Sequence, residues 1–423
     1  MNQLTEYRRE FHKYPENGWR EFRTSARVAE ILTGMGYDVA MGPDVIEPGS
    51  VGEPERLSEE QIRQEMERAV RQGADPAFVK RTQGWPGVMA VLDTGREGPV
   101  SAMRFEMDCL PYDEPQRPGY RPCDEGYLSC NPQSVHACGH DGHTTILLRF
   151  ARMLSERPLP KGRVLLLFQP AEENGSGSKA VLDTKVLDYY KIDKAFALHN
   201  IPGYPASAVL CKEDSFTCAV VSVSITLTGK TSHAAEPQKG ISPIPATLNI
   251  VDELLRWNNT DIQSDDYFLS TIVEIHVGEE AYGVSAGNSV IRATLRAKTD
   301  KLLHQHAQQL KELVATECKR TPDLQHEMEW LEPFSANEND PQSVGMIKNA
   351  ALRNNLPYIE LQTPFSWGED FGLFMQQYKG AIFGLGSGEN CAPLHSPQYD
   401  FPDEVIETGA TLFYTIAEEN QRL

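Results

Sequence analysis

Short, continuous apolar runs separated by helical stretches dominate the first half of the chain after residue 88. The helical stretches include Thr144–Leu154. Continuous apolar strands that alternate with helices are typical of a sheet covered on both faces. The pattern therefore predicts an α/β domain, preceded by two helices at Asn2–Tyr14 and Glu21–Met35. The predicted strands are Val88–Leu92, Val100–Phe105, Val164–Phe168 and Ala195–Leu198.

A different pattern begins at Ala219–Thr228, where apolar residues alternate with Ser and Thr. Strict alternation predicts a strand with one exposed face. Two more strands and two helices complete a β-α-β-β-α set of roughly 115 residues, a normal size for an independent α+β domain. The strands are Ser270–Val277 and Ser289–Thr299, and the helices are Ile244–Trp257 and Lys301–Lys319.

The helix–strand pattern of the first half resumes after Phe334. We therefore predict a larger α/β domain made of residues 1–215 and 331–423, with the α+β domain of residues 216–330 inserted between its two parts. The elements predicted in the second part are Gln342–Arg353, Phe371–Gln377, Ala381–Leu385 and Glu404–Glu419.

One polar segment of the first part contains a further helix. Ser58 and Gln61 form a capping box, the sequence signature of a helix start. Four apolar residues recur behind it at helical spacing, and almost all others are charged, which favours a solvent-exposed surface helix. A partner-binding helix is the alternative. The apolar residues are Ile62, Met66, Ala69 and Val70.

Composition narrows the classes of protein that this chain could represent. The 60 acidic against 40 basic residues give a net charge of −20, which repels nucleic acid and anionic membranes. The longest apolar run, Val164–Phe168, is far shorter than the ~20 residues of a membrane span. No apolar secretory segment is visible, and the eight cysteines include no CxxC pair. We therefore expect a cytoplasmic enzyme with reduced cysteines and with neither nucleic acid nor membrane as partner.

The densest chemical string is His136-Ala-Cys138-Gly-His140-Asp141-Gly-His143. Cysteine and histidine are good ligands for zinc and related divalent ions, and the glycines allow neighbouring side chains to converge. A helix-entry loop with incidental histidines is the structural alternative. The string therefore indicates a candidate metal site.

Three further strings place polar residues after apolar strands. Glu172 and Glu173 follow one strand, His199 ends the next, and His395 comes after a glycine-rich strand exit. Each alone is equally typical of a solvated loop or a structural histidine, but open α/β sheets bind ligands at such strand ends. Together with the dense string, they supply the groups for a two-metal site, and Glu172 remains as a carboxylate that can carry a proton. The candidate ligands are Cys138, His140, Glu173, His199 and His395.

Two short matches in the inserted domain have other interpretations. Thr228-Gly-Lys-Thr-Ser232-His233 is not a phosphate loop, because the glycine required upstream is replaced by Ser224. His233 follows a strand in a turn and is either catalytic or structural. The string Gly283-Val-Ser285-Ala-Gly287 matches a serine-hydrolase nucleophile, but that motif needs a helix after the serine, and a strand is predicted there.

Read in order, seven strings resemble one family, the co-catalytic metallopeptidase and amidohydrolase superfamily. The resemblance is to its branch of hippurate hydrolase, N-acyl-amino-acid amidohydrolases, auxin-conjugate hydrolases and aminobenzoyl-glutamate hydrolase, and it runs from about residue 3 to the C-terminus. HACGHDGH and the Gln-Pro-Ala-Glu-Glu string are the most specific. The strings are MDCLP (107–111), HACGHDGH (136–143), FQPAEE (168–173), ALHN (197–200), GKTSHAA (229–235), GEDF (368–371) and LHSP (394–397).

The resemblance implies a catalytic domain formed by both ends of the chain and an inserted lid that pairs two subunits into a homodimer. It implies that Glu172 is the general base and that His233 reaches the active site of the neighbouring subunit. It also implies two divalent metal ions per subunit, zinc or manganese, and a small-molecule substrate. The residues that match the family's metal ligands are Cys138, His140, Glu173, His199 and His395.

The predicted activity is metal-dependent hydrolysis of the amide bond in N-acyl or N-aroyl amino acids or small peptide-like conjugates. A dipeptidase or carboxypeptidase of the same superfamily is the alternative, and a serine hydrolase using Ser285 is a less favoured one. The chain departs from the family in the lid, where Gly283 stands in place of a frequent Asn and Lys230 in place of a frequent Arg. Asp108 matches an aspartate near the family's metal site, but Glu106 replaces its usual partner, so no ligand role is assigned to Asp108.

Overall fold

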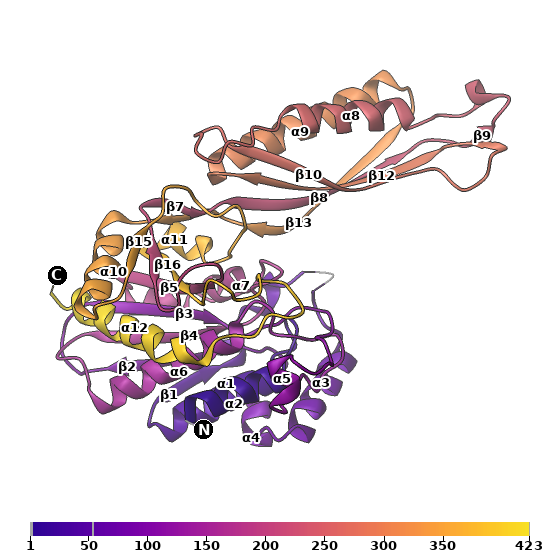
Figure 1. The fold of residues 1–423 in the computed structure, drawn as a ribbon. Helices are drawn as coiled ribbons and strands as arrows, with labels where there is room; N and C mark the ends of the chain where they lie inside the picture. The colour runs from indigo at the N-terminus through magenta and orange to yellow at the C-terminus, as the bar shows by residue number, and fades with distance from the viewer. Residues whose placement is uncertain (1–2, 53–54, 423) are drawn as a thin grey trace. The chain divides into compact units, whose positions relative to one another are not determined.

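The computed structural model describes residues 3–52 and 55–422, which form two compact units (Figure 1). The first unit contains the described residues up to Asp214, Glu338–Leu361 and the described residues from Asp370 onward. The second contains Ser215–Asn337 and Gln362–Glu369. The chain passes between them in the short strands β7 (Asp214–Thr217) and β14 (Asn337–Asn339).

An eight-stranded mixed sheet forms the centre of the first unit, in the order β1-β2-β4-β3-β5-β16-β6-β15. Its four central strands, β4, β3, β5 and β16, run parallel, and β2 and β6 on either side run antiparallel to them. The carboxyl ends of the four parallel strands therefore share one edge of the sheet, where open α/β folds place their ligands. The strands are β1 (Asp38–Met41), β2 (Val88–Asp93), β3 (Val100–Glu106), β4 (Arg163–Gln169), β5 (Lys194–Ile201), β6 (Val209–Cys211), β15 (Tyr358–Glu360) and β16 (Gly380–Gly386).

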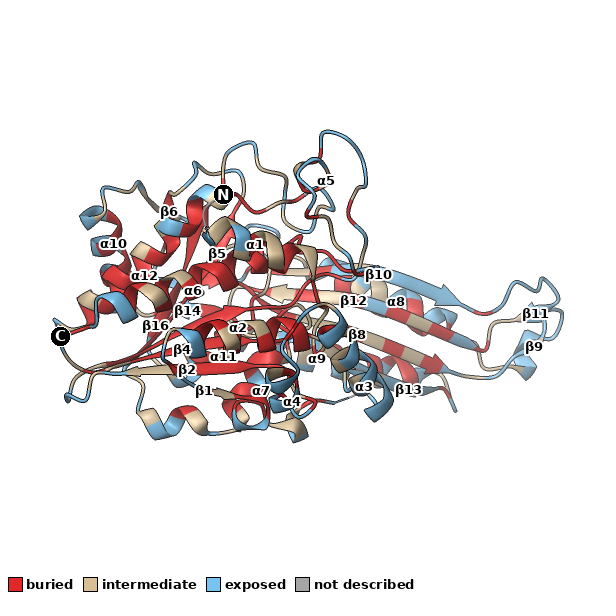
Figure 2. Ribbon diagram, turned by 90° about the horizontal axis from the view of Figure 1, so that it is seen from below, coloured by how far each residue is buried: buried red, intermediate tan, exposed pale blue. Residues whose placement is uncertain are grey.

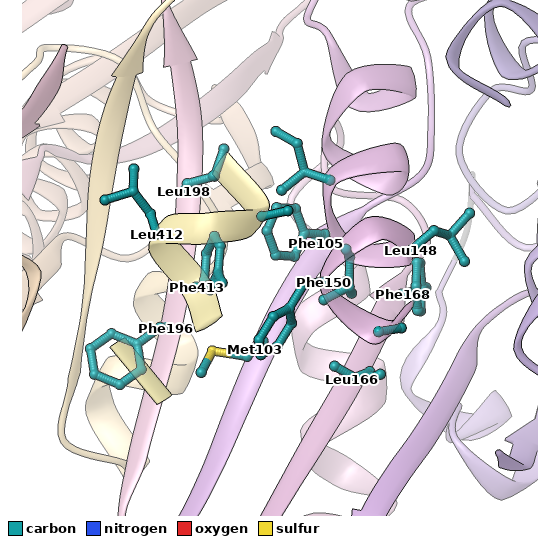
Figure 3. Packing of buried hydrophobic residues seen from close by; sticks show 14 of the residues in the cluster. Met103, Phe105, Leu148, Phe150, Leu166, Phe168, Phe196, Leu198, Leu412 and Phe413 are labelled. Atoms are coloured by element: carbon teal, nitrogen blue, oxygen red, sulfur yellow. The ribbon is translucent and has the colours of Figure 1, made fainter. Parts of the chain in front are cut away.

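The main apolar core lies between this sheet and the helices on one of its faces. Phe105 of β3 packs against Phe413 of α12, with ring centroids 4.9 Å apart (Figure 3). Every residue of β3 and β5 is buried, so both faces of the central strands are covered, as the apolar runs predicted (Figure 2). The helices of the unit are α1 (Gln3–Lys13), α2 (Phe22–Gly34), α3 (Glu59–Arg71), α4 (Pro76–Arg81), α5 (Arg121–Asp124), α6 (His140–Glu156), α7 (Gly177–Asp183), α10 (Pro341–Arg353), α11 (Gly372–Gln377) and α12 (Ile406–Asn420), with 3-10 turns at Gly42–Asp44, Pro48–Ser50, Val186–Tyr190 and Asp403–Val405.

Helix α3 is the surface helix that the capping box predicted. The Gln61 backbone N–H donates to the Ser58 hydroxyl, and the Ser58 N–H donates to the Gln61 side chain. Its apolar side chains contact Phe22 and Ala26 of α2 in a small separate core, so this side of the helix is covered within the unit. One member of the predicted stripe, Val70, is instead 38% exposed.

The second unit is built on a four-stranded antiparallel sheet in the order β10-β12-β8-β13. Its order along the chain is β-α-β-β-α-β, one strand more than the sequence pattern predicted. The additional strand, β13, was missed because it is an edge strand with mostly charged or exposed residues, and only Met328 and Trp330 pack against the core. The elements are β8 (Ala219–Thr228), β9 (Ser232–His233), α8 (Ile244–Arg256), β10 (Phe268–Val277), β11 (Val284–Ser285), β12 (Asn288–Ala297), α9 (Asp300–Arg320) and β13 (Gln325–Phe334), with a 3-10 turn at Pro237–Lys239.

A short return of the chain, Gln362–Glu369, also belongs to the second unit, although residues 331–423 were predicted to lie in the other domain. The backbone of Phe365 explains this placement. Its N–H donates to the Phe216 carbonyl at 2.8 Å, and its carbonyl accepts the Cys218 N–H at 3.0 Å. None of the helices among the described residues is long and apolar enough to cross a membrane.

Candidate metal centre and active site

Six of the seven predicted site residues lie in the first unit, and four of them come at or after the carboxyl ends of its parallel strands. Glu172 and Glu173 follow β4, His199 lies near the end of β5, and His395 lies in the segment after β16. The other two, Cys138 and His140, lie at the start of α6. The topology therefore brings strings from four parts of the chain to one sheet edge, as the strand-end argument predicted.

Gly139 separates Cys138 from His140 and is the N-cap of α6, with φ +92°. A Cβ atom at this position would lie 2.8 Å from the side-chain oxygen of Asn200. Only glycine combines this backbone conformation with such a close approach. The glycine therefore lets the thiol and the imidazole on either side of it approach the same point.

Hydrogen bonds orient the two imidazoles nearest the thiol. The Nδ1 of His140 lies 3.0 Å from the carbonyl oxygen of Asp108 and 3.1 Å from its carboxylate, and Nδ1 of His199 lies 3.0 Å from the carbonyl oxygen of Asn200. Because these partners are acceptors, each Nδ1 carries the proton and each Nε2 keeps its lone pair. This is the arrangement that a histidine metal ligand requires.

The spacing of the ligand atoms fits metal ions. The Cys138 Sγ lies 3.5 Å from His199 Nε2, His140 Nε2 lies 3.8 Å from a Glu173 oxygen, and the other Glu173 oxygen lies 3.5 Å from His395 Nε2. Two atoms that bind the same ion at ~2.0–2.3 Å are separated by up to roughly 4.5 Å. The chain thus provides two groups that share Cys138, namely Cys138–His140–His199 and Cys138–Glu173–His395.

Two buried atoms of this cluster have no hydrogen-bond partner among the described residues, His140 Nε2 and Glu173 Oε1. A buried polar atom without a partner is costly, and a bound cation would satisfy both atoms. The donor set of thiol, imidazole and carboxylate is one that binds zinc and related ions. The residues present therefore fit a divalent metal centre.

Burial and neighbouring charges shift the pKa values of these groups in the metal-free chain. Burial raises the pKa of the Cys138 thiol well above its usual range, and the Glu173 and Glu172 carboxylates raise it further. Burial alone would lower the pKa of His140, but its hydrogen bond to Asp108 and the charge of Glu106 raise it to about 10. Burial raises the pKa of Glu173 to about 7, against the opposing effect of His140. Protons thus occupy positions where a metal would bind.

Glu172 occupies a strained turn just after β4. Ala171 before it has φ +53°, a left-handed conformation that side chains rarely adopt, and its N–H donates to buried Glu21 at 2.7 Å. One oxygen of Glu172 accepts the Asp370 N–H at 3.4 Å, and the other lies 3.9 Å from His140 Nε2. The carboxylate is therefore beside the candidate metal centre.

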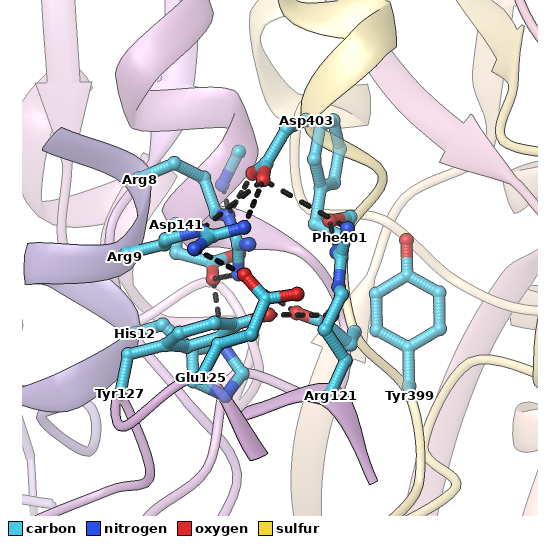
Figure 4. Close-up of polar contacts among 12 residues, drawn as sticks. Arg8, Arg9, His12, Arg121, Glu125, Tyr127, Asp141, Tyr399, Phe401 and Asp403 are labelled. Carbon is cyan, nitrogen blue, oxygen red and sulfur yellow. Dashed lines mark hydrogen bonds and ion pairs between the residues drawn. The ribbon is translucent and has the colours of Figure 1, made fainter. Parts of the chain in front are cut away.

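Residues that the sequence did not single out support the cluster from behind. His143 is not turned toward a metal, because its Nδ1 contacts Glu106 and its Nε2 accepts the Asn200 N–H at 3.2 Å. Asp141, next to His140, lies 2.8 Å from Nδ1 of His12 and 3.6 Å from the Arg8 guanidinium (Figure 4). The supporting ion pairs of Arg8 with Asp400 and Asp403 join α1 to a segment almost 400 residues away, so no local pattern indicates them.

His233 lies in the second unit, on β9, where it pairs with Val284 of β11. Its side chain is exposed, and the Ala235 N–H donates to its Nδ1 at 3.0 Å. Since Nδ1 is an acceptor, the neutral ring carries its proton on Nε2. His233 therefore presents an N–H donor to its surroundings.

The serine-hydrolase alternative lacks its structural basis. Ser285 is followed by the strand β12 instead of the helix that the motif requires, and its hydroxyl lies 2.7 Å from that of Ser232. The Gly-Lys-Thr string is likewise followed by β9 instead of a helix, which agrees with its rejection as a phosphate loop.

A parallel α/β sheet with thiol, imidazole and carboxylate ligands beside a second carboxylate defines a metal-dependent hydrolase type of site. The chain belongs to the peptidase family M20/M25/M40, whose sequence profile matches residues 102–419. It is an enzyme of the amidohydrolase and peptidase class, which hydrolyses amide bonds.

Two relatives and one solved structure illustrate the match. The chain is 32% identical over 417 residues to one of the chains of p-aminobenzoyl-glutamate hydrolase from Escherichia coli, covering 95% of this chain and 92% of that one. It is 27% identical over 419 residues to N-acetyl-L-cysteine deacetylase of Bacillus subtilis, covering 98% and 88%. The fold is similar to that of a dinuclear metal-binding M20 peptidase of Bacillus subtilis, with a TM-score of 0.75 at 22% identity, covering 99% and 98%.

Proposed function

We propose that this enzyme hydrolyses the amide bond of N-acyl or N-aroyl amino acids, using two divalent metal ions per subunit. The observation that supports it most strongly is the pair of ligand groups sharing Cys138, next to a carboxylate that belongs to the site. The proposed ligands are Cys138, His140, Glu173, His199 and His395. When bound, zinc or manganese ions would supply Lewis acidity, which lowers the pKa of water from 15.7 toward ~7 and polarises a carbonyl oxygen.

Glu172 is the proton carrier of the proposed reaction. An amide has a poor leaving group, so the departing amine must receive a proton as the bond breaks. The Glu172 oxygen that faces His140 Nε2 at 3.9 Å is on the side of the candidate metal centre. This oxygen takes a proton from the attacking water and then delivers it to the amine nitrogen.

His233 serves as a hydrogen-bond donor to the substrate's carbonyl oxygen as negative charge develops there. Its Nδ1 already accepts the Ala235 N–H, so Nε2–H is the donor. A donor at such a position contributes ~3–4 kcal/mol to many hydrolytic reactions. We propose that this His233 acts in the partner subunit of a homodimer.

The proposed homodimer forms through the second unit. Its sheet ends at strand β10, whose apolar side chains are exposed, with Val273 at 65% and Ile275 at 48%. Helix α8 also exposes apolar side chains, Leu248 at 64% and Leu255 at 51%. Exposed apolar edge strands invite pairing with another chain, and a second copy of this unit would cover these residues.

The substrate class is supported by the names of the two relatives, which act on p-aminobenzoyl-glutamate and on N-acetyl-L-cysteine. In both compounds an acyl group is attached to the amine of an amino acid. A dipeptide offers the same bond, so a dipeptidase or carboxypeptidase is the competing function. The two differ in whether the acyl part must carry a free amine.

The test is turnover of a panel of N-acetyl, N-benzoyl and indoleacetyl amino acids beside dipeptides, with and without added Mn²⁺ or Zn²⁺. We expect metal-dependent cleavage of acylated amino acids, and elemental analysis should show about two ions per chain. Cys138→Ala should lose metal and activity together, whereas Cys211→Ala, which removes another buried thiol of the same unit, should keep both. Full activity in excess EDTA with no metal left would refute the proposal, and cleavage of dipeptides alone would favour the peptidase.

A further inference from the structure

Asp370 is a buried residue whose carboxylate is held on several sides. It forms an ion pair with Arg104, accepts from the Gln169 side-chain amide at 2.8 Å and accepts the Ser178 N–H at 2.9 Å. Asp370 and Arg104 are 0% and 1% exposed. The partners come from β3, the end of β4 and the start of α7, so Asp370 is fixed to three separate elements.

The backbone of Asp370 faces Glu172. Its N–H lies 3.4 Å from one Glu172 oxygen, while the other Glu172 oxygen faces His140 Nε2. The two oxygens of this carboxylate therefore have different surroundings. One accepts a hydrogen bond from a rigidly held backbone, and the other is directed to the candidate metal centre.

We propose that Asp370 and Arg104 are positioning residues for Glu172, an inference that rests on the proposed role of Glu172 as proton carrier. The Arg104–Asp370 pair holds the Asp370 N–H in place, and this N–H holds the Glu172 carboxylate in the orientation that proton transfer needs. A displacement of about 1 Å in a reacting group can lower the rate ~100-fold, so such support has a large effect on turnover.

Stability alone is a weak explanation for this pair. Burying two charges carries a desolvation penalty that their attraction often only balances, so apolar residues can replace buried ion pairs without loss of stability. The chain offers a comparison in Lys194 and Asp340, a nearly buried pair at 2.6 Å in the same unit. Asp340 also accepts a serine N–H, from Ser343 at 3.0 Å, but Lys194 begins β5, five residues before His199. That end of the strand is ~16 Å from the metal side.

The experiment is a double-mutant cycle between Asp370→Asn and Glu172→Gln, measured on an N-acyl amino acid that the enzyme turns over. Asp370→Asn keeps the shape of the side chain but weakens its pairing with Arg104. In the otherwise native enzyme we expect kcat to fall about 10- to 100-fold, with KM changed less than about 3-fold and metal content unchanged. In the Glu172→Gln background, whose residual rate is measured at high enzyme concentration, the same change should lower kcat less than about 2-fold.

The control is Asp340→Asn, which weakens a similar ion pair away from the site and should leave kcat within about 2-fold in both backgrounds. If Asp370→Asn fails to fold, Arg104→Lys takes its place, because lysine keeps the charge but loses the planar fork that holds the carboxylate. Equal losses of kcat in both backgrounds, or a loss matched by Asp340→Asn, would overturn the positioning role. Full activity of Glu172→Gln alone would instead refute the proposed proton carrier.

Discussion

Glu172 and Glu173 are adjacent in sequence, but their carboxylates have different partners. Glu173 places an oxygen 3.5 Å from Nε2 of His395, whereas Glu172 accepts the backbone N–H of Asp370 at 3.4 Å. Both also approach His140 Nε2, at 3.8 and 3.9 Å. One strand end thus supplies a carboxylate that lies among the candidate ligands and another that is held beside them.

This difference predicts separable effects of substitution. Glu172→Gln keeps the shape of the side chain but removes the proton acceptor, so metal content should persist while kcat falls by about 10²–10⁴. Glu173→Gln removes a charged ligand and should lower metal occupancy. Elemental analysis of each purified variant, beside its kinetics, measures both effects. Equal loss of metal in the two variants would contradict this division of roles.

The pKa values of the metal-free site predict that metal binding releases protons. The Cys138 thiol has a raised pKa, that of His140 is about 10 and that of Glu173 is about 7, so at neutral pH these groups hold protons that a metal must displace. Each proton released makes the apparent affinity rise ~10-fold per pH unit. We expect more than one proton per chain at pH 7, and an affinity that increases from pH 6 to pH 8.

Titration of metal-free protein with Zn²⁺ or Mn²⁺ in weakly buffered solution, followed with a pH indicator, counts these protons. Cys211→Ala should release the same number, because that buried thiol lies outside the ligand cluster. An affinity that is constant or decreases with rising pH would show that the three groups are already deprotonated without metal.

His12 predicts a second pH effect, on stability. Its ring nitrogens lie 2.8 Å from Asp141 and 3.2 Å from Glu114. Burial lowers its pKa, but the hydrogen bonds with these two carboxylates outweigh burial and raise it to about 9 from an ordinary 6.5. A raised pKa stabilises the fold fully below the unfolded value of 6.5, and this stabilisation is lost as the pH rises through 9. The contribution is about 3 kcal/mol.

His12→Gln should therefore lower the free energy of unfolding by roughly 1–3 kcal/mol at pH 6 and by clearly less at pH 9.5. Urea unfolding of both proteins in EDTA measures the difference without a contribution from bound metal. His304→Gln, on an exposed position of α9, gives the change expected at the surface, within about 0.5 kcal/mol. A difference that is the same at both pH values would mean that His12 is uncharged in the folded protein.

The central strands and the convergence of the ligands could be predicted from the sequence because both depend on local patterns. Continuous apolar runs indicate strands buried on both faces, and polar residues after parallel strands meet at one edge. His199 at the end of β5 and Glu173 after β4 come together for this reason. The edge strand β13 could not be predicted, since its Glu327 and Glu329 are exposed and only two of its side chains pack against the core.

The supporting contacts of the site were also beyond local patterns. Arg8 and His12 lie one turn apart on α1 and resemble ordinary surface residues of an amphipathic helix. Their burial depends on partners that are distant in sequence, Asp141 and Asp403 (Figure 4). Asp370 is a similar case, because its pairing with Arg104 joins residues 266 positions apart. Such contacts follow from the completed fold, not from the spacing of residues.

The last prediction concerns His233 and the proposed dimer. If His233 acts in the partner's active site, two inactive variants should complement each other. Glu172→Ala and His233→Ala are each expected to be nearly inactive alone. In a mixed dimer with two-fold symmetry, one site then carries both lesions and the other carries neither. The exposed side chain of His233, with its Nε2–H available as donor, is consistent with this arrangement.

Mixing equal amounts under conditions of free exchange between dimers makes about half of the dimers mixed, so roughly a quarter of all sites should be intact. We therefore expect about 25% of native activity to return, with a time course that follows exchange measured independently with differently tagged chains. If His233 acts within its own chain, every site in every dimer keeps one lesion and mixing restores nothing. Verified mixed dimers without restored activity would make His233 a same-chain or structural residue and remove the reason for requiring a dimer in catalysis.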